Sequence, residues 1–352
     1  LVRNFDETLA LVEEILLEPR WDEEEFSRIK IKTINEIKRS DANPNVVAGR
    51  VYNKILYGEN HIFSYPISGT VASVEAITIE DLKTFYYKNF SPSISNFHIV
   101  GAITELDSKN NLASIGKKWA AKEVVIPSYL AENNRDKASL YFVDIPGAKQ
   151  SVLNIGYISM ARTDKDFYSA EVMNYKLGGS FSGNVNLILR EEKGYTYGAR
   201  TGFNGSKIKG TFKASSSVRT NTTGESVSIF KEQIADYKNG ISQEDLDFTK
   251  NAMIKSNARR FETQFSLLGM LQEMSTYNLP VDYIAKEEAL ISAMTLEQHK
   301  DLANKYLDES KMAYVIIGDA ATQFSQFKDM GFDEVMLMSK EGQEIEIDDV
   351  KM

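Results

Sequence analysis

The sequence contains one pattern of secondary structure twice, and this repeat constrains the fold more than any other feature. The segment ITIEDLKTFYYKNFSPSISNFHIVGAI aligns without gaps with MTLEQHKDLANKYLDESKMAYVIIGDA. Thr78 then matches Thr295 and Gly101 matches Gly318, both at an offset of 217. Each segment predicts a helix that begins at a capping threonine, then a connector, then an apolar strand that ends in glycine.

Earlier parts of the repeat predict matching helices in both copies. WDEEEFSRIKIKTINEIKRS resembles ISQEDLDFTKNAMIKSNARR, so that Phe26 matches Leu246 at an offset of 220. Both stretches predict a long helix opened by a capping residue, Asp22 or Ser242. A period this long is far beyond that of a solenoid repeat and indicates two homologous domains.

The second copy has a front part that the first copy lacks. Residues 139–220 predict two strands around a Pro-Gly turn, a helix from about Asp166 to Lys176, and a hairpin with Asn204-Gly205 as its turn. A domain without its first strands exposes strand edges and apolar faces, so we expect the natural protein to extend upstream. The predicted division is 1–125 for the C-terminal part of a first domain, 126–138 for a linker, and 139–352 for a complete second domain with a C-terminal tail.

Composition excludes several kinds of function. Lysine and arginine number 41 against 50 aspartate and glutamate, and the net charge of −9 argues against a nucleic-acid partner because phosphate binding needs a positive surface. Cysteine is absent, which excludes disulfides, thiolate nucleophiles and cysteine zinc sites. The three histidines lie far apart in the sequence, so it has no local histidine metal motif. No apolar run approaches the roughly 20 residues of a membrane span.

The segment LGGSFSGNVNLILREEKGYTYGARTGF carries the most specific pattern. Gly178-Gly179 ends one helix, Ser182 or Asn184 is placed to cap the next, and Gly194 stops it. Arg190 then lies in the last helical turn and Tyr197 just inside the following strand. Their seven-residue spacing across a tight glycine turn would allow a guanidinium and a phenol to reach one surface.

Each of these two side chains also has an ordinary structural explanation. Arg190 alone fits a cation favoured by the helix dipole at a helix C-terminus. Tyr197 alone fits an ordinary sheet residue. Tyr195 also competes with it for the role, because strand alternation places both on one face and spacing does not separate them.

The same segment resembles the pitrilysin and insulinase type of zinc metallopeptidases, which includes the mitochondrial processing peptidase. The resemblance extends over the whole chain and includes LYG, SVEAIT and HIVGAI in the first copy. It implies an α+β fold of two homologous domains, each a mostly antiparallel sheet with helices packed on one face, the first incomplete at its N-terminus. The positions that match the family's second-domain pattern are Gly178, Gly179, Phe181, Ser182, Leu189, Arg190, Glu191, Lys193, Gly194, Tyr197 and Gly198.

The resemblance implies a zinc site in which a His-x-x-Glu-His helix and a downstream glutamate hold the metal. It also implies that an arginine and a tyrosine assist peptide hydrolysis from the other side of a chamber. Those assisting roles fall on Arg190 and Tyr197, with Gly178, Gly179, Ser180 and Phe181 expected to bind substrate. The zinc motif is absent from this sequence. Glu36 aligns with the downstream zinc ligand, although a solvated helix residue is the simpler interpretation. Ile29 stands where the family has a second acid, which favours a half that never bound zinc.

The expected function is the non-zinc half of a bipartite zinc endopeptidase that closes a chamber, binds extended peptide by strand addition, and assists hydrolysis. The expected partners are a zinc-bearing half or subunit and a peptide, with zinc in the complete assembly, none bound by this chain, and the isolated chain inactive. Two alternatives stay open: a truncated catalytic half whose zinc motif lies upstream, and a scaffold subunit of the bc1-complex core type. A bacterial periplasm or cell envelope is preferred to the cytoplasm as location.

Overall fold

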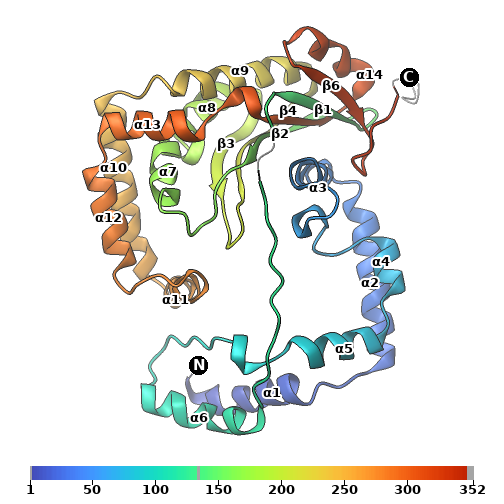
Figure 1. The fold of residues 1–352 in the computed structure, drawn as a ribbon, viewed down its shortest axis with the longest axis vertical. Helices are drawn as coiled ribbons and strands as arrows, with labels where there is room; N and C mark the ends of the chain where they lie inside the picture. The colour runs from blue at the N-terminus through green and yellow to red at the C-terminus, as the bar shows by residue number, and fades with distance from the viewer. Residues whose placement is uncertain (1, 133–134, 347–352) are drawn as a thin grey trace. The chain divides into compact units, whose positions relative to one another are not determined.

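The computed structural model describes residues 2–132 and 135–346, and its contacts divide the chain into two compact units (Figure 1). Unit 1 and unit 2 interleave along the chain. The predicted domain boundaries at residues 125 and 138 concern the sequence repeat and stay a prediction. Unit 1 comprises Leu1–Lys38, Ser68–Ser128 and Ser256–Val281, and unit 2 comprises Arg39–Ile67, Tyr129–Lys255 and Asp282–Met352.

Unit 1 is built from helices. Lys30 joins two of them, because its Nζ donates hydrogen bonds to the carbonyl oxygens of Glu75 and Ile77 at 2.8 and 2.7 Å. Trp21 packs edge-on against Tyr86 with ring centroids 5.5 Å apart. The helices are η1 (Val2–Asn4), α1 (Phe5–Leu17), α2 (Glu23–Ser40), α4 (Val71–Ala76), α5 (Ile79–Asn89), η3 (Pro92–Ile94), α6 (Glu105–Lys118), η7 (Ala258–Phe261) and α11 (Gln264–Tyr277).

The repeated helices form as the sequence predicts. α5 and α13 (Leu296–Tyr306) have the same length and begin 217 residues apart. Thr78 and Thr295 cap them. The side-chain oxygen of each threonine accepts a hydrogen bond from the backbone N–H three residues on, and the backbone N–H of each threonine donates one to the side chain there. Asp22 caps α2, and Ser242 caps α10 (Gln243–Asn257).

The strand predicted to follow α5 does not form. Residues 96–101 are assigned to no strand, whereas the matching segment after α13 is β5 (Ala313–Gly318), whose residues are all buried. β5 is hydrogen-bonded on both sides, to β1 (Ser139–Asp144) and to β2 (Gln150–Ile158). Unit 1 contains no strand among its described residues, so the first-copy segment has no hydrogen-bonding neighbour.

Unit 2 contains a six-stranded sheet in the order β3-β4-β2-β5-β1-β6. Three of its strand pairings are antiparallel and two are parallel, which confirms the predicted α+β fold with a mostly antiparallel sheet. The two strands around the Pro-Gly turn are not neighbours, because β5 lies between them. The strands are β1 (Ser139–Asp144), β2 (Gln150–Ile158), β3 (Thr196–Asn204), β4 (Thr211–Arg219), β5 and β6 (Glu334–Met338).

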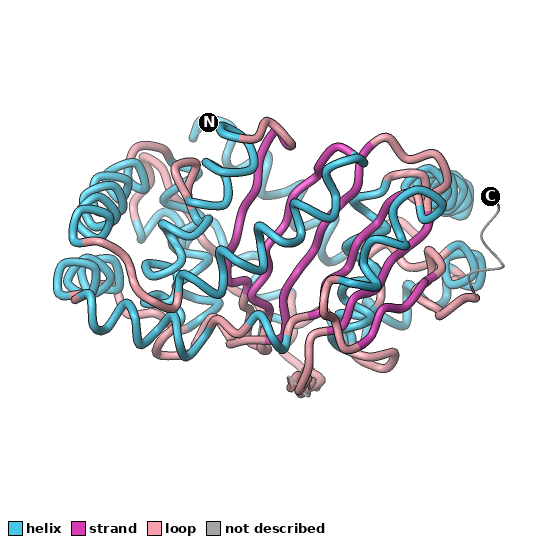
Figure 2. The backbone as a smooth tube through the Cα atoms, turned by 90° about the horizontal axis from the view of Figure 1, so that it is seen from above, coloured by secondary structure: helices cyan, strands magenta, loops and turns pink. Residues whose placement is uncertain are grey.

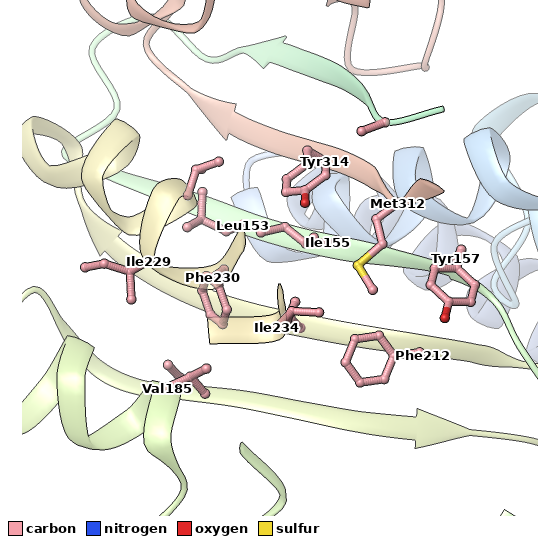
Figure 3. Packing of buried hydrophobic residues seen from close by; sticks show 14 of the residues in the cluster. Leu153, Ile155, Tyr157, Val185, Phe212, Ile229, Phe230, Ile234, Met312 and Tyr314 are labelled. Atoms are coloured by element: carbon pink, nitrogen blue, oxygen red, sulfur yellow. The ribbon is translucent and has the colours of Figure 1, made fainter. Parts of the chain in front are cut away.

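The main core lies between one face of this sheet and a layer of helices (Figures 2 and 3). Leu153 and Ile155 of β2 and Phe212 of β4 meet Phe230 and Ile234 of α9, all nearly inaccessible to solvent. The helical segments of unit 2, apart from two described next, are α7 (Phe167–Asn174), the π-helical η4 (Tyr175–Gly179), α8 (Asn184–Asn186), the π-helical η5 (Leu187–Glu192), η6 (Thr220–Thr222), α9 (Thr223–Tyr237), α10, α12 (Tyr283–Ala293), α13, η8 (Glu309–Lys311), α14 (Ala320–Gln323) and η9 (Phe324–Asp329).

One helix packs on the opposite face of the sheet, which the sequence did not predict. Val47 and Val51 of α3 (Pro44–Tyr57) pack on Val152 of β2 and Val315 of β5. The Tyr52 hydroxyl donates a hydrogen bond to the Phe212 carbonyl oxygen at 3.1 Å. The short η2 (Ile62–Ser64) follows this helix. The second face is therefore covered over β2 and β5.

The hairpin of β3 and β4 forms as predicted, but the predicted turn is wrong. Asn204 pairs with Thr211 as the last rung of the ladder, so the loop runs over residues 205–210 rather than closing at Asn204-Gly205. The loop bonds to another segment, because Arg162 N donates to Ser206 O at 2.8 Å. No helix in the described part of the chain has the length and apolarity to cross a bilayer.

Candidate functional site

The Gly-Gly segment ends a helix because the backbone must pass close to a strand there. A Cβ on Gly178 would lie 2.7 Å from the Thr201 backbone nitrogen of β3 and 2.7 Å from Val185. Gly178 is buried, and close packing explains it without substrate. The next helix, α8, is capped by Gly183 without a side-chain hydrogen bond, so the predicted capping by Ser182 or Asn184 is wrong.

Two buried asparagines fix this segment to β3. Asn174 Nδ2 donates to Thr201 O at 2.9 Å, and Thr201 Oγ1 donates back to Asn174 Oδ1 at 2.6 Å. Asn186 Nδ2 donates to Phe181 O at 2.7 Å, while its Oδ1 accepts from Ala199 N at 3.0 Å. Sequence reasoning missed both asparagines, because a lone asparagine in a helical stretch gives no signal of its partner.

These hydrogen bonds also occupy the free edge of the sheet. β3 is an edge strand, so its backbone groups that do not bond β4 face outward. At Ala199 and Thr201, side chains of this same chain already satisfy such groups. At the other edge, Ile345 N donates to Leu337 O of β6 at 2.9 Å. A peptide strand pairing at Ala199 and Thr201 would have to displace these hydrogen bonds, and the expected strand addition at a sheet edge stays a prediction.

A bulge at the start of β3 presents Tyr197. The register with β4 shifts between Thr196 and Ala199. Thr196 Oγ1 donates to Ser217 O at 2.7 Å and accepts from Gly198 N at 3.0 Å. A bulge re-aims the side chain it carries, and Tyr197 is 89% exposed. The bulge is held by hydrogen bonds that do not involve the phenol.

The structure separates the two tyrosines that alternation left equivalent. Tyr195 packs against the main core, and its hydroxyl donates to Glu225 Oε2 at 2.6 Å. Lys193 Nζ also donates to Glu225, at 2.8 Å, and together they lower the pKa of that carboxyl, with Lys193 the larger cause. The hydrogen bond to Glu225 raises the pKa of Tyr195. Tyr195 thus has a structural role, and Tyr197 is the phenol available to a ligand.

Arg190 lies in η5 beside an aromatic ring. Its guanidinium carbon is 4.7 Å from the ring centroid of Phe181, which is 63% exposed. Its Nε is 3.2 Å from Glu191 Oε1, and its carbonyl accepts from Gly194 N at 3.2 Å. Among the residues that the structure describes, no hydrogen bond or ring contact joins Arg190 to Tyr197.

The remaining predicted substrate positions differ in accessibility. Gly179 and Phe181 are exposed, and Ser180 is half-buried with its hydroxyl 3.3 Å from that of Ser182. No ligand contact tests their role, which stays a prediction.

The described residues do not supply a zinc site. Within residues 2–132 and 135–346, no three histidine, aspartate or glutamate side chains gather where they could hold a metal ion. Glu36 is exposed on α2 and lies 3.8 Å from Lys32 Nζ, one turn away. Ile29, where the resemblance would place an acid, is half exposed on the same helix.

We predict that Asn186→Ala destabilises unit 2 by about 2 to 4 kcal/mol, because it leaves Ala199 N–H and Phe181 C=O without partners. Urea unfolding followed by circular dichroism measures the change. Asn184→Ala is the matched control, since its side chain caps nothing although it begins the same helix. Equal midpoints for the two variants would contradict the assigned role of Asn186.

The chain is similar in sequence and in fold to several known proteins. The chain is 26% identical over 238 residues to the probable inactive metalloprotease YmfF of Bacillus subtilis (strain 168), covering 65% of this chain and 54% of that protein. It is 19% identical over 322 residues to the non-peptidase homolog YmxG of Helicobacter pylori, covering 89% and 72%. The crystal structure of a peptidase M16 inactive domain from Pseudomonas fluorescens superposes with a TM-score of 0.83 and 25% identity, over 92% of this chain and 77% of that chain.

The chain spans about half the length of the first of these relatives. A family model described as the peptidase M16 inactive domain matches residues 76–253, which is half of the chain and includes the whole Gly-Gly to Tyr-Gly segment. The resemblance to zinc metallopeptidases read from that segment is thereby confirmed, and the chain belongs to the peptidase M16 inactive domain family.

Proposed function

We propose that this chain is the non-zinc half of a bipartite endopeptidase, in which it holds extended peptide opposite a zinc-bearing family member. The proposal rests on the exposure and fixed position of Tyr197. A phenol that is 89% exposed adds nothing to the core, yet it is mounted on a bulge fixed by Thr196 and by buried Asn186. A fixed backbone of this kind holds a side chain in the one orientation in which it can contact a ligand.

The chemistry available to this chain is hydrogen bonding and positive charge. The Tyr197 hydroxyl would donate to the oxygen of the scissile carbonyl as negative charge develops on it, and preorganised donors of this kind act mainly in the transition state. The Arg190 guanidinium would hold a peptide carbonyl in place. Stacking on Phe181 limits its motion, and with Nε directed to Glu191 the two Nη groups are left to donate. Cleavage itself would take place on the partner half.

Peptide would reach these groups over the surface of unit 2 rather than by pairing at Ala199 and Thr201 of β3, whose outward groups are already bonded. Phe181 is exposed beside Arg190, Gly179 is exposed two residues earlier in the chain, and both are available to such a peptide. A periplasmic or cell-envelope location stays part of the proposal.

A scaffold without any peptide role is the second candidate. It is favoured by one observation, the name non-peptidase homolog carried by a relative that matches 89% of this chain. The two candidates differ in whether Tyr197 and Arg190 matter to peptide.

Two assays on the isolated chain test the proposal. We expect no zinc-dependent hydrolysis of fluorogenic peptides, and we expect binding of a fluorescein-labelled unstructured peptide by fluorescence anisotropy. Arg190→Ala should weaken that binding about tenfold because Arg190 is assigned to holding peptide, while Lys207→Ala, at an exposed cation of unit 2, should leave it unchanged. Hydrolysis by the isolated chain, or equal binding by both variants, would refute the proposed role.

A further inference from the structure

The second face of the sheet carries a polar area beyond the part that α3 covers. Along β4, Phe212, Ala214 and Val218 belong to the main core, so the residues between them point to the other face. One of these is Lys213. On β3, Ala199 and Phe203 are core residues, which places Arg200 on the second face with Lys213.

The strand register places Lys213 between two glycines. It is opposite Gly156 of β2 on one side and Gly202 of β3 on the other. A Cβ built on Gly202 would meet nothing within 4 Å, so the space beside Lys213 over β3 is open. The side of Lys213 that faces β3 therefore has room for a ligand.

The neighbouring row supplies more polar groups. Arg200, Ser215 and Asn154 lie directly opposite one another on three adjacent strands. Arg200 is exposed, Ser215 is half-buried and Asn154 is buried, so Arg200 and Ser215 are the members of this row that a ligand can reach. Arg200 and Lys213 are diagonal neighbours in the ladder, a relation that separates the α-carbons by about 7 to 8 Å.

Neither cation has an acidic partner in the described part of the chain, where no ion pair to Arg200 or Lys213 forms. Two other cations of unit 2 do pair with acids: Arg50 with Asp41 at 2.7 Å and Lys209 with Glu132 at 2.7 Å. Burial lowers the pKa of Lys213, the direction expected of an ammonium group that loses water without gaining an anion.

We propose that Arg200 and Lys213 form a subsite for an extended peptide that carries two acidic side chains at positions i and i+2. Alternate side chains of an extended peptide lie on one side and are separated by about 6.6 Å, which matches the diagonal of the two cations. Ser215 would add a hydroxyl donor between them. This inference rests on the proposed peptide-binding function and adds a preference for acidic sequence.

The test uses three labelled peptides of one length with amidated C-termini, which remove the terminal carboxylate as a source of binding. One contains Glu-Ser-Glu, one contains Glu-Glu-Ser, and one contains Gln-Ser-Gln. We expect the full chain to bind Glu-Ser-Glu about tenfold more tightly than Gln-Ser-Gln at low salt, with Glu-Glu-Ser between them. The preference should disappear in the Arg200→Gln, Lys213→Gln double variant.

Lys207→Gln is the matched control, because Lys207 is an exposed cation in the loop of the same hairpin. It removes one charge and should keep the preference. Circular dichroism melts check that each variant is folded. An acidic preference that survives in the double variant, or equal affinity for Glu-Ser-Glu and Glu-Glu-Ser, would overturn the subsite. Equal binding of all three peptides would also overturn it and leave the proposed function standing, whereas no binding of any peptide would refute both.

Discussion

Replacing Gly156 by alanine is expected to lower the free energy of unfolding of unit 2 by more than about 4 kcal/mol. A Cβ at this position would lie 1.9 Å from the Phe212 carbonyl oxygen and 2.6 Å from the Tyr52 hydroxyl. Moving either of these two atoms would disrupt the packing of the sheet. The carbonyl belongs to β4, which pairs with β2 over its whole length, and the hydroxyl belongs to α3, where it is held by the same carbonyl. Relief requires separating β2 from β4 or lifting α3 from the sheet.

Gly202→Ala is the control for this prediction. Gly202 lies on the same face, on the other side of Lys213, and an added methyl there would meet nothing within 4 Å. Its effect should stay within about 0.5 kcal/mol. Urea unfolding followed by far-ultraviolet circular dichroism compares the two variants. Similar midpoints for both would contradict the close approach of β2 to α3 and β4.

Local signals in the sequence predicted the helices well. A threonine followed three residues later by Asp81 or Gln298 forms a capping box, so a few adjacent residues decide where α5 and α13 begin. The strands depend on partners. The first-copy apolar segment at 96–101 and β5 have similar patterns, yet only β5 finds β1 and β2 as neighbours. Strand propensity indicates that a segment would fit into a sheet, but it does not indicate whether partner strands are present beside that segment.

The sequence indicated where the candidate residues lie along the chain, but it did not indicate the residues that support them. The spacing of Arg190 and Tyr197 located a helix end and a strand start, but alternation could not choose between the tyrosines. The bulge at the start of β3 distinguishes the two tyrosines. The bulge depends on a register shift against β4, which the sequence of one strand alone does not encode. Asn174 and Asn186 bond to residues 27 and 13 positions away, so their importance emerges only from the fold.

In an assembly reconstituted with a zinc-bearing M16 protein of the same organism, recognised by its His-x-x-Glu-His motif, Tyr197→Phe is expected to reduce kcat about 100- to 1000-fold. The change removes one hydrogen-bond donor and keeps the ring. Because Tyr197 is 89% exposed and its bulge is held by Thr196, the melting temperature should not change. KM should change little, since a donor to a developing oxyanion acts mainly after substrate is bound.

Tyr195→Phe provides the matched control for that experiment. It removes the same atom from a neighbouring tyrosine and breaks the hydrogen bond to Glu225, an exposed contact of small energetic value. It should leave kcat intact. Arg190→Ala should instead raise KM, because Arg190 is assigned to holding peptide. If Tyr197→Phe turns over substrate as fast as Tyr195→Phe, the phenol has no part in hydrolysis, and a scaffold role becomes the better account of this chain.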